Sequence, residues 1–272
     1  MDEAHEEFEK GLKQESSNLA QSEFEKIFQT MTSIILGKKL TGYLDYENWL
    51  SKNVSNIDTV KSAISNEPIY IPQQFEFYQD VKPKIVTIDE AYEKLGKKQL
   101  SDSELEKLTL KNASKTLKNI SMTTMDTQYG KNVKVISSSL YYESHVGLKS
   151  TGMVYSKYSL FSFWPRQSDY TMGCYYLFSS KFCVRCFNSE NLNRCFEVSD
   201  SANCSDCYFC YNCENLNDCM FCFNVKSKRY AIANVEVGKE KYLEIKKMFL
   251  EELGKKLEKE KKLDLSIFNI LG

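Results

Sequence analysis

The residues of this chain that could do chemistry are its cysteines. All ten lie between Cys174 and Cys222, in a chain of 272 residues. Many follow one another as C-x-x-C, a spacing typical of sites in which thiolates hold zinc or an iron–sulfur cluster in tetrahedral geometry. On this interpretation zinc is the cofactor, and the candidate ligands are Cys183, Cys186, Cys204, Cys207, Cys210, Cys213, Cys219 and Cys222.

The regular spacing of the cysteines favours a different explanation. Every gap between successive cysteines is 3, 6 or 9 residues, so all ten share one triplet register. This register produces each C-x-x-C pair without a metal, and the pairs lack the glycines that usually shape zinc knuckles. We therefore predict ladders of reduced cysteines inside a repeat structure. Metal binding and disulfide bonds remain alternatives, since rungs about 4.8 Å apart match the Cα spacing of a disulfide.

A near-duplication sets the size of the repeat. The sequence CVRCFNSENLNRC at 183–195 returns as CYFCYNCENLNDC at 207–219, 24 positions later. Neither an α-helix, with about 3.6 residues per turn, nor a flat strand keeps a period of three over this length. A square β-solenoid coil of about twelve residues, half the length of the duplication, has one inward residue on each of its sides. Such a coil satisfies both the period of three and the 24-residue duplication. A coil as long as the whole duplication is the second choice.

Folding the sequence at the shorter length aligns small side chains in columns. One column runs Gly147, Ser159, Thr171, Cys183, Cys195, Cys207, Cys219 and Ala231. Cysteine suits a narrow interior because it behaves as a small hydrophobic residue with a weak hydrogen-bond donor. Asparagine and aspartate recur just before inward positions, as at Asp200, Asn212 and Asn224. We expect these residues to form left-handed corners.

Aromatic residues align on the outside of the predicted coils. They are Tyr175, Phe187, Phe196, Tyr208, Tyr211 and Phe223. A solenoid face that carries such a ladder is either covered by another element or available to a partner. These six residues are therefore the candidate interaction residues.

Helical patterns flank the predicted solenoid. Helices are expected over 1–36, after Asp45, after Asn56, and near 88–95 and 102–117, whereas the proline-containing stretch 67–86 is expected to be extended. Capping-box patterns occur at Ser22 with Glu25, Thr87 with Glu90, and Ser101 with Glu104. At the other end, Leu243, Leu250, Leu253 and Leu257 give 239–262 one apolar face.

The predicted fold is α+β in three parts. Residues 1–125 form a mainly helical N-terminal domain, 126–238 form the cysteine-rich β-solenoid, and 239–272 form an amphipathic capping helix with an apolar tail. End coils of a solenoid expose backbone and core, so caps of this kind are expected.

The stretch CMFCFNVKSKRYAIANVEVGKEKYLEIKK resembles the C-terminal signature of a large, uncharacterised cysteine-rich family of small-genome bacteria and archaea. Members carry C-x-x-C repeats that end in a C-F-G-C-V-x-L-R-N-K-x-Y-C-I-x-N pattern, followed by an acidic-basic helix. Matching residues are Cys219, Phe221, Cys222, Val225, Lys226, Lys228, Tyr230, Ile232 and Asn234; Asn224 and Ala231 depart from the pattern. The resemblance covers residues 168–250 and implies no known activity. The N-terminal zinc ribbon of many relatives is absent, because no cysteine precedes Cys174.

Composition and motifs argue against several classes of function. The formal net charge is −1, which gives no global attraction to nucleic acid or to a membrane. No P-loop, Rossmann fingerprint or G-x-S-x-G occurs, and His5 and His145 are the two histidines, so we do not expect an enzyme. The chain shows no secretory signal and no apolar run long enough to cross a membrane, which favours a cytoplasmic location.

These observations favour a non-enzymatic scaffold or protein-binding solenoid within a larger assembly, with a protein partner or a second copy on its surface. One alternative is a zinc-binding protein associated with nucleic acid or the ribosome, which the net charge does not support. Another is a thiol redox or metal-storage protein. Metal analysis of the purified protein separates the scaffold from both alternatives.

Overall fold

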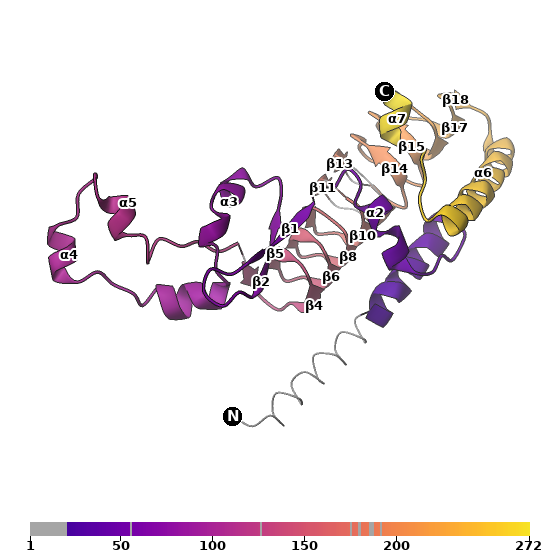
Figure 1. Cartoon of the computed structure of the whole chain (residues 1–272). Coiled ribbons are helices and arrows are strands. Elements are labelled where there is room, and N and C mark those ends of the chain that lie inside the picture. The colour runs from indigo at the N-terminus through magenta and orange to yellow at the C-terminus, as the bar shows by residue number, and fades with distance from the viewer. Residues whose placement is uncertain are drawn as a thin grey trace, which may run out of the picture.

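A helical N-terminal region, a β-solenoid and a C-terminal helix follow one another along the chain (Figure 1). The computed structural model describes residues 21–54, 56–125, 127–174, 176–178, 181–184, 188–190 and 192–272. The predicted fold class is confirmed, with about eight solenoid coils.

The solenoid strands form two parallel sheets. The larger contains β4 (Val133–Ile136), β6 (His145–Leu148), β8 (Lys157–Leu160), β10 (Asp169–Met172), β12 (Lys181–Val184), β14 (Phe196–Ser199), β15 (Tyr208–Tyr211), β16 (Asn217–Met220) and β17 (Arg229–Ile232), closed by the short antiparallel β18 (Val235–Glu236). The smaller contains β3 (Gln128–Tyr129), β5 (Ser139–Tyr142), β7 (Thr151–Val154), β9 (Pro165–Arg166), β11 (Tyr176–Phe178) and β13 (Asn188–Glu190). Ser159 pairs with Thr171 and Thr171 with Cys183, which confirms the shorter coil, of about twelve residues, over the longer one.

Each of the four sides of a coil uses three residues: one inward, one outward and one at the corner. The corner residues have positive φ at every third position, including the predicted Asp200, Asn212 and Asn224, at 49°, 51° and 56°. Asn212 Nδ2 donates to Asn224 Oδ1 at 2.7 Å, and Asn203 Nδ2 to Asn215 Oδ1 at 3.3 Å. The expected left-handed corners are therefore confirmed, and hydrogen bonds between asparagines join corners of neighbouring coils.

Serine fills the first half of the interior and cysteine the second, and both make the same hydrogen bonds. Ser150 Oγ donates to the Leu148 carbonyl at 2.9 Å, and Cys207 Sγ donates to the Ser205 carbonyl at 3.2 Å, two residues back in each case. The interior hydroxyls and thiols are thus small groups that bond to carbonyls of their own coil. This equivalence explains why one triplet register holds both residue types.

One outward column of the solenoid is apolar in every coil. Its members pair from coil to coil: Ile136, Leu148, Leu160, Met172, Val184, Phe196, Tyr208, Met220 and Ile232. We call this surface the apolar face. It is covered by a helix over 21–36, the one-turn elements η1 (Tyr43–Tyr46) and α2 (Glu47–Leu50), and the long helix α6 (Lys239–Glu260), which share one core with it (Figure 1). Burial of apolar area stabilises this arrangement.

The helical segments within residues 21–50 therefore pack on the solenoid and share its core, whereas Ile69, Ile71, Ile85 and Met125 form a small separate core. Phe24, Phe28 and Met31 of the 21–36 helix are buried in the shared core, as their helical spacing predicts. The predicted capping role of Glu25 is wrong, because residue 21 is already helical and the Glu25 carboxylate accepts from the Gly42 amide at 3.0 Å. The start of that helix lies outside the described residues.

Residues 56–125 are less helical than predicted. The helix expected after Asn56 is wrong: residues Ile57–Lys61 are strand β1, paired antiparallel with β2 (Pro68–Pro72), since β-branched residues favour a strand. Short helical turns follow at α3 (Glu76–Asp80), η2 (Lys82–Lys84), η3 (Glu90–Leu95), α4 (Asp102–Glu106) and α5 (Ala113–Thr116). The stretch 67–86, predicted to be extended, is a strand at Pro68–Pro72 but helical at α3 and η2, so that prediction is only partly right. The capping box of Ser101 with Glu104 is confirmed.

At the C-terminal end, Leu253 and Leu257 of α6 are buried as expected, but Leu243 is 46% exposed and Tyr242 takes its place in the core. The apolar tail folds back as α7 (Ile267–Leu271), whose first amide donates to buried Glu197 at 3.0 Å. The tail thus packs on the solenoid through a carboxylate at a helix N-terminus.

We predict that the protein loses stability at low pH because Glu90 becomes protonated. Burial by itself would raise the pKa of this carboxyl, but hydrogen bonds from Ser62 Oγ and the Thr87 amide outweigh it and lower the pKa to about 2. The stabilisation is therefore present above the unfolded-state pKa of 4.5 and is lost as the pH falls toward about 2. Between about pH 6 and about pH 2, the free energy of unfolding of the wild type should fall by up to about 3 kcal/mol more than that of Glu90→Gln. Equal losses in denaturant titrations of both proteins would contradict this.

Candidate functional site

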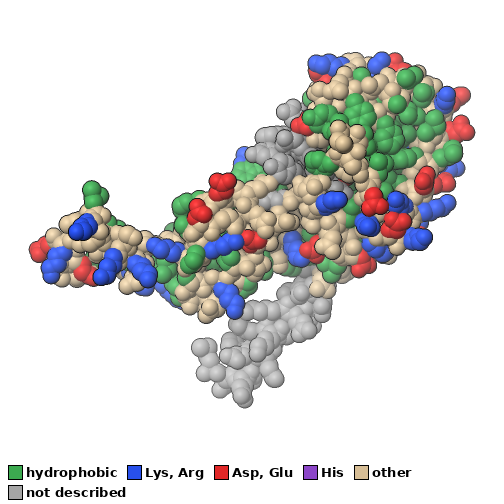
Figure 2. All heavy atoms as spheres, turned by 45° about the horizontal axis from the view of Figure 1, so that its top comes forward, with side chains coloured by type: hydrophobic (Ala, Val, Ile, Leu, Met, Phe, Trp, Pro, Cys, Tyr) green, Lys and Arg blue, Asp and Glu red, His purple; other side chains and the backbone are tan. Residues whose placement is uncertain are grey.

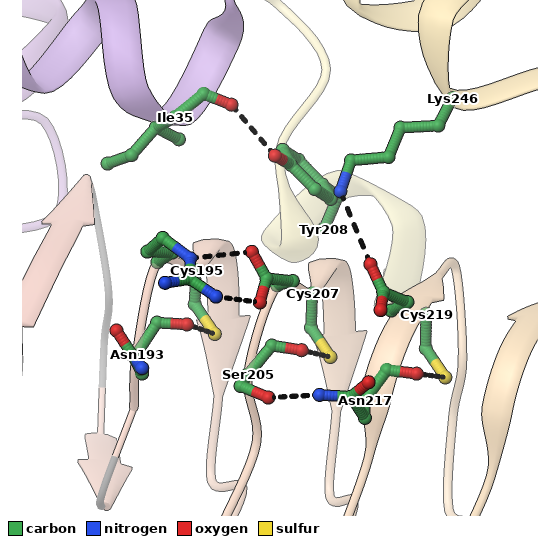
Figure 3. A network of polar contacts seen from close by, with 12 residues as sticks. Ile35, Asn193, Cys195, Ser205, Cys207, Tyr208, Asn217, Cys219 and Lys246 are labelled. Carbon is green, nitrogen blue, oxygen red and sulfur yellow. Dashed lines mark hydrogen bonds and ion pairs between the residues drawn. The ribbon is translucent and has the colours of Figure 1, made fainter. Parts of the chain in front are cut away.

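The interior thiols are the first candidate site. All nine described cysteines are at most 4% exposed; Cys186 lies outside the described residues. In consecutive coils, Cys195, Cys207 and Cys219 point to the same side and bond to backbone carbonyls (Figure 3). Within the described parts of the chain, no group of three or more cysteine, histidine or acidic side chains could hold a metal ion. The described candidate metal ligands are thus placed as interior side chains.

Burial lowers the reactivity of two of these thiols in particular. It raises the pKa of the Cys210 and Cys213 thiols, which lowers the fraction of reactive thiolate. We expect a thiol reagent such as Ellman's reagent to leave the nine described cysteines unmodified in the native protein and to modify all ten in denaturant. Rapid native modification of several thiols would contradict the packed interior.

The candidate interaction residues divide into two groups. Phe196 and Tyr208 lie on the covered apolar face: the Phe196 ring centroid is 6.3 Å from that of Trp49, and Tyr208 Oη donates to the Ile35 carbonyl at 2.8 Å (Figure 3). Lys246 of α6 lies over the Tyr208 ring at 5.0 Å. These two aromatic residues hold the helices onto the solenoid and are not available to a partner.

The remaining aromatic candidates lie on the next side of the coil. Tyr211 and Phe223 face outward in neighbouring coils, bridge to one another and are half-buried. Tyr175 and Phe187 lie outside the described residues. The aromatic ladder is therefore exposed only in part where the structure describes it.

A different surface, missed by sequence reasoning, stands out in the structure. Residues 96–124, all of which the structure describes, contain no buried residue, and 101–110 are all exposed. We call 96–124 the arm; it projects away from the solenoid and contains α4 and α5 (Figures 1 and 2). Leu105, Leu108 and Leu110 are 53%, 36% and 102% exposed. The sequence predicted a helix near 102–117, and only the absence of a covering element in the structure reveals the arm.

The base of the arm is firmly held. The Val86 amide donates to the Thr123 carbonyl at 2.9 Å, and the Thr123 amide to the Lys84 carbonyl at 3.1 Å. Ile85 and Met125 beside this connection are fully buried together with Ile69 and Ile71. The arm is thus an exposed segment whose base is fixed by backbone hydrogen bonds and a small buried core.

A row of exposed tyrosines runs from the base of the arm along the solenoid. Tyr92 of η3 is hydrogen-bonded to Tyr129, which pairs with Tyr142 between β3 and β5. The ring centroid of Tyr142 is 5.0 Å from that of Tyr155. These four residues, the tyrosine row, are 66%, 52%, 37% and 54% exposed in the order given. Tyrosine is enriched at protein interfaces, so the row and the arm are candidates for one interaction surface.

The fold and these surfaces define a capped β-solenoid with a filled interior, helices on one face and an exposed arm. Comparison with protein-family models, curated proteins and solved structures found no match. The resemblance to the cysteine-rich family stays a prediction. Among the described residues, no helix combines the length and the apolar character needed to cross a membrane.

Proposed function

We propose that this protein is a non-enzymatic scaffold that binds another protein through the arm. The observation that carries the proposal is the exposure of Leu105, Leu108 and Leu110 on a segment without a buried residue. Leucine is normally among the most buried residue types, and clustered exposed leucines mark interaction sites. A partner would supply the apolar surface that the chain itself does not.

The charge of the arm indicates the chemistry of the partner. The arm has six lysines and three acidic residues, a formal charge of +3 in a chain whose net charge is −1. Complementary potentials favour association and select partners. The partner is therefore proposed to be a protein with an apolar pocket inside an acidic surface.

The buried interior supports a scaffold over the thiol-redox alternative. A redox or metal-storage thiol has to be reached by its partner, and the described cysteines are at most 4% exposed. The solenoid instead supplies a rigid body from which the arm and the tyrosine row are presented.

The proposal is tested by capture followed by a direct binding measurement. Full-length protein and a variant in which residues 97–121 are replaced by a short Gly-Ser linker are used to capture proteins from the source cell. A protein retained only by the full-length chain is purified and titrated against both chains. Specific binding that needs the arm supports the proposal, whereas equal retention of every protein by both chains contradicts it.

A further inference from the structure

A cavity of about 490 Å³ lies where the N-terminal region, the β1–β2 hairpin and the solenoid meet. Three successive coils contribute to it through Ser137, Lys149 and Phe161, which occupy the same corner of each coil. Its volume falls within the range of small-molecule sites, about 300–1,000 Å³, and such sites favour junctions between structural units.

The walls of the cavity are polar but carry no unbalanced charge. The uncharged polar side chains are Ser51, Asn56, Thr59, Tyr70, Gln73 and Ser137. Hydroxyl and amide groups both donate and accept hydrogen bonds. The two charged side chains, Glu47 and Lys149, form an ion pair with each other.

Existing contacts hold several of these groups in place. Ser137 Oγ is 3.3 Å from Tyr70 Oη, and Gln73 Nε2 donates to Asp58 Oδ1 at 2.7 Å. One part of the lining is apolar, because Val54 and Phe161 contribute buried side chains. The cavity thus combines fixed polar groups with an apolar patch.

We infer that this cavity binds a small neutral saccharide. A sugar ring has hydroxyl groups around its edge, which match groups that both donate and accept, and an apolar C–H face, which matches Val54 and Phe161. A neutral ligand is favoured over an ionic one because the two charged side chains of the lining, Glu47 and Lys149, are paired with each other. The inference is independent of the arm and goes beyond the scaffold function.

The test is isothermal titration of the full chain with glucose, galactose and N-acetylglucosamine, with adenosine and glutamate as comparison ligands. The blocking variant is Ser137→Tyr, at φ 50°, a backbone position that tyrosine already occupies at Tyr155 with φ 50°. The matched control is Ser227→Tyr, an exposed corner with φ 54° outside the cavity lining. Circular dichroism verifies that both variants fold.

At least one sugar is expected to bind the wild type and the control with equal affinity. The same sugar should bind Ser137→Tyr about tenfold or more weakly. Thr59→Val removes one hydroxyl from an exposed strand position. This variant is expected to bind the same sugar about threefold to tenfold more weakly than the wild type. The inference is overturned if no sugar binds at about 20 mM, if Ser137→Tyr binds as well as the control, or if only adenosine or glutamate binds.

Discussion

A chain in which Leu105, Leu108 and Leu110 are all replaced by serine is expected to lose its protein partner and keep its stability. Burying one leucine side chain in a complex contributes about 1.5–3 kcal/mol, so losing three should weaken binding by about a thousandfold or more. The free chain should be unaffected because the three side chains are exposed, and exposed substitutions usually change stability by less than about 0.5 kcal/mol. Titration with the purified partner and thermal unfolding measure the two effects.

The matched control is Leu243→Ser with Met248→Ser on α6, two apolar residues that are 46% and 66% exposed away from the arm. This control should keep the affinity of the wild type. Unchanged binding by the arm variant would exclude the arm as the docking segment. A large drop in its melting temperature would show instead that the leucines already stabilise the free chain.

The second large effect is expected on the apolar face. Phe196→Ala should lower the free energy of unfolding by about 3–5 kcal/mol, the usual cost of removing a buried phenylalanine ring. Phe196 is fully buried, and its ring centroid lies 6.3 Å from that of Trp49 and 5.4 Å from that of Phe209. The substitution would remove the ring contacts with Trp49 and Phe209 inside the core that the N-terminal region shares with the solenoid.

The measurement is denaturant unfolding followed by circular dichroism, with Phe223→Ala as control. Phe223 occupies an outward position on the neighbouring side of the coil and is only half-buried, so the same chemical change should cost less than half as much. Equal losses in the two variants would be incompatible with a core centred on the apolar face.

The interior of the solenoid could be predicted from the sequence because the position of a residue within the repeat decides whether its side chain faces inward. Cys207 is inward since every third residue faces the interior, and this holds for any coil that keeps the backbone repeat. The left-handed corners at Asn212 and Asn224 follow from the same repeat together with the tolerance of asparagine for positive φ. Trp164, at φ 61°, shows that the repeat imposes the corner even on a residue that does not favour it.

The flanking region was harder to predict because several of its elements are one turn long. The segment beginning at Ile57 has both a helix-start signal and β-branched residues, and pairing with Pro68–Pro72 selects the strand. The arm carries good helix signals, such as the capping box at Ser101, yet nothing in those signals states whether a covering surface exists. Exposure is a property of the whole fold, so the candidate docking site could not be read from the segment itself.

The sequence by itself predicted the inward cysteines and serines and the asparagine corners, because a repeating backbone assigns each residue its direction from its position in the triplet. It favoured a coil of about twelve residues, and the strand pairing decided between this length and one twice as long. Only the tertiary structure decided which outer face is covered and which surface stays open. The hydrogen bond from Tyr208 to the Ile35 carbonyl joins residues 173 positions apart. Contacts of that range depend on how separate elements pack, and no local period specifies them.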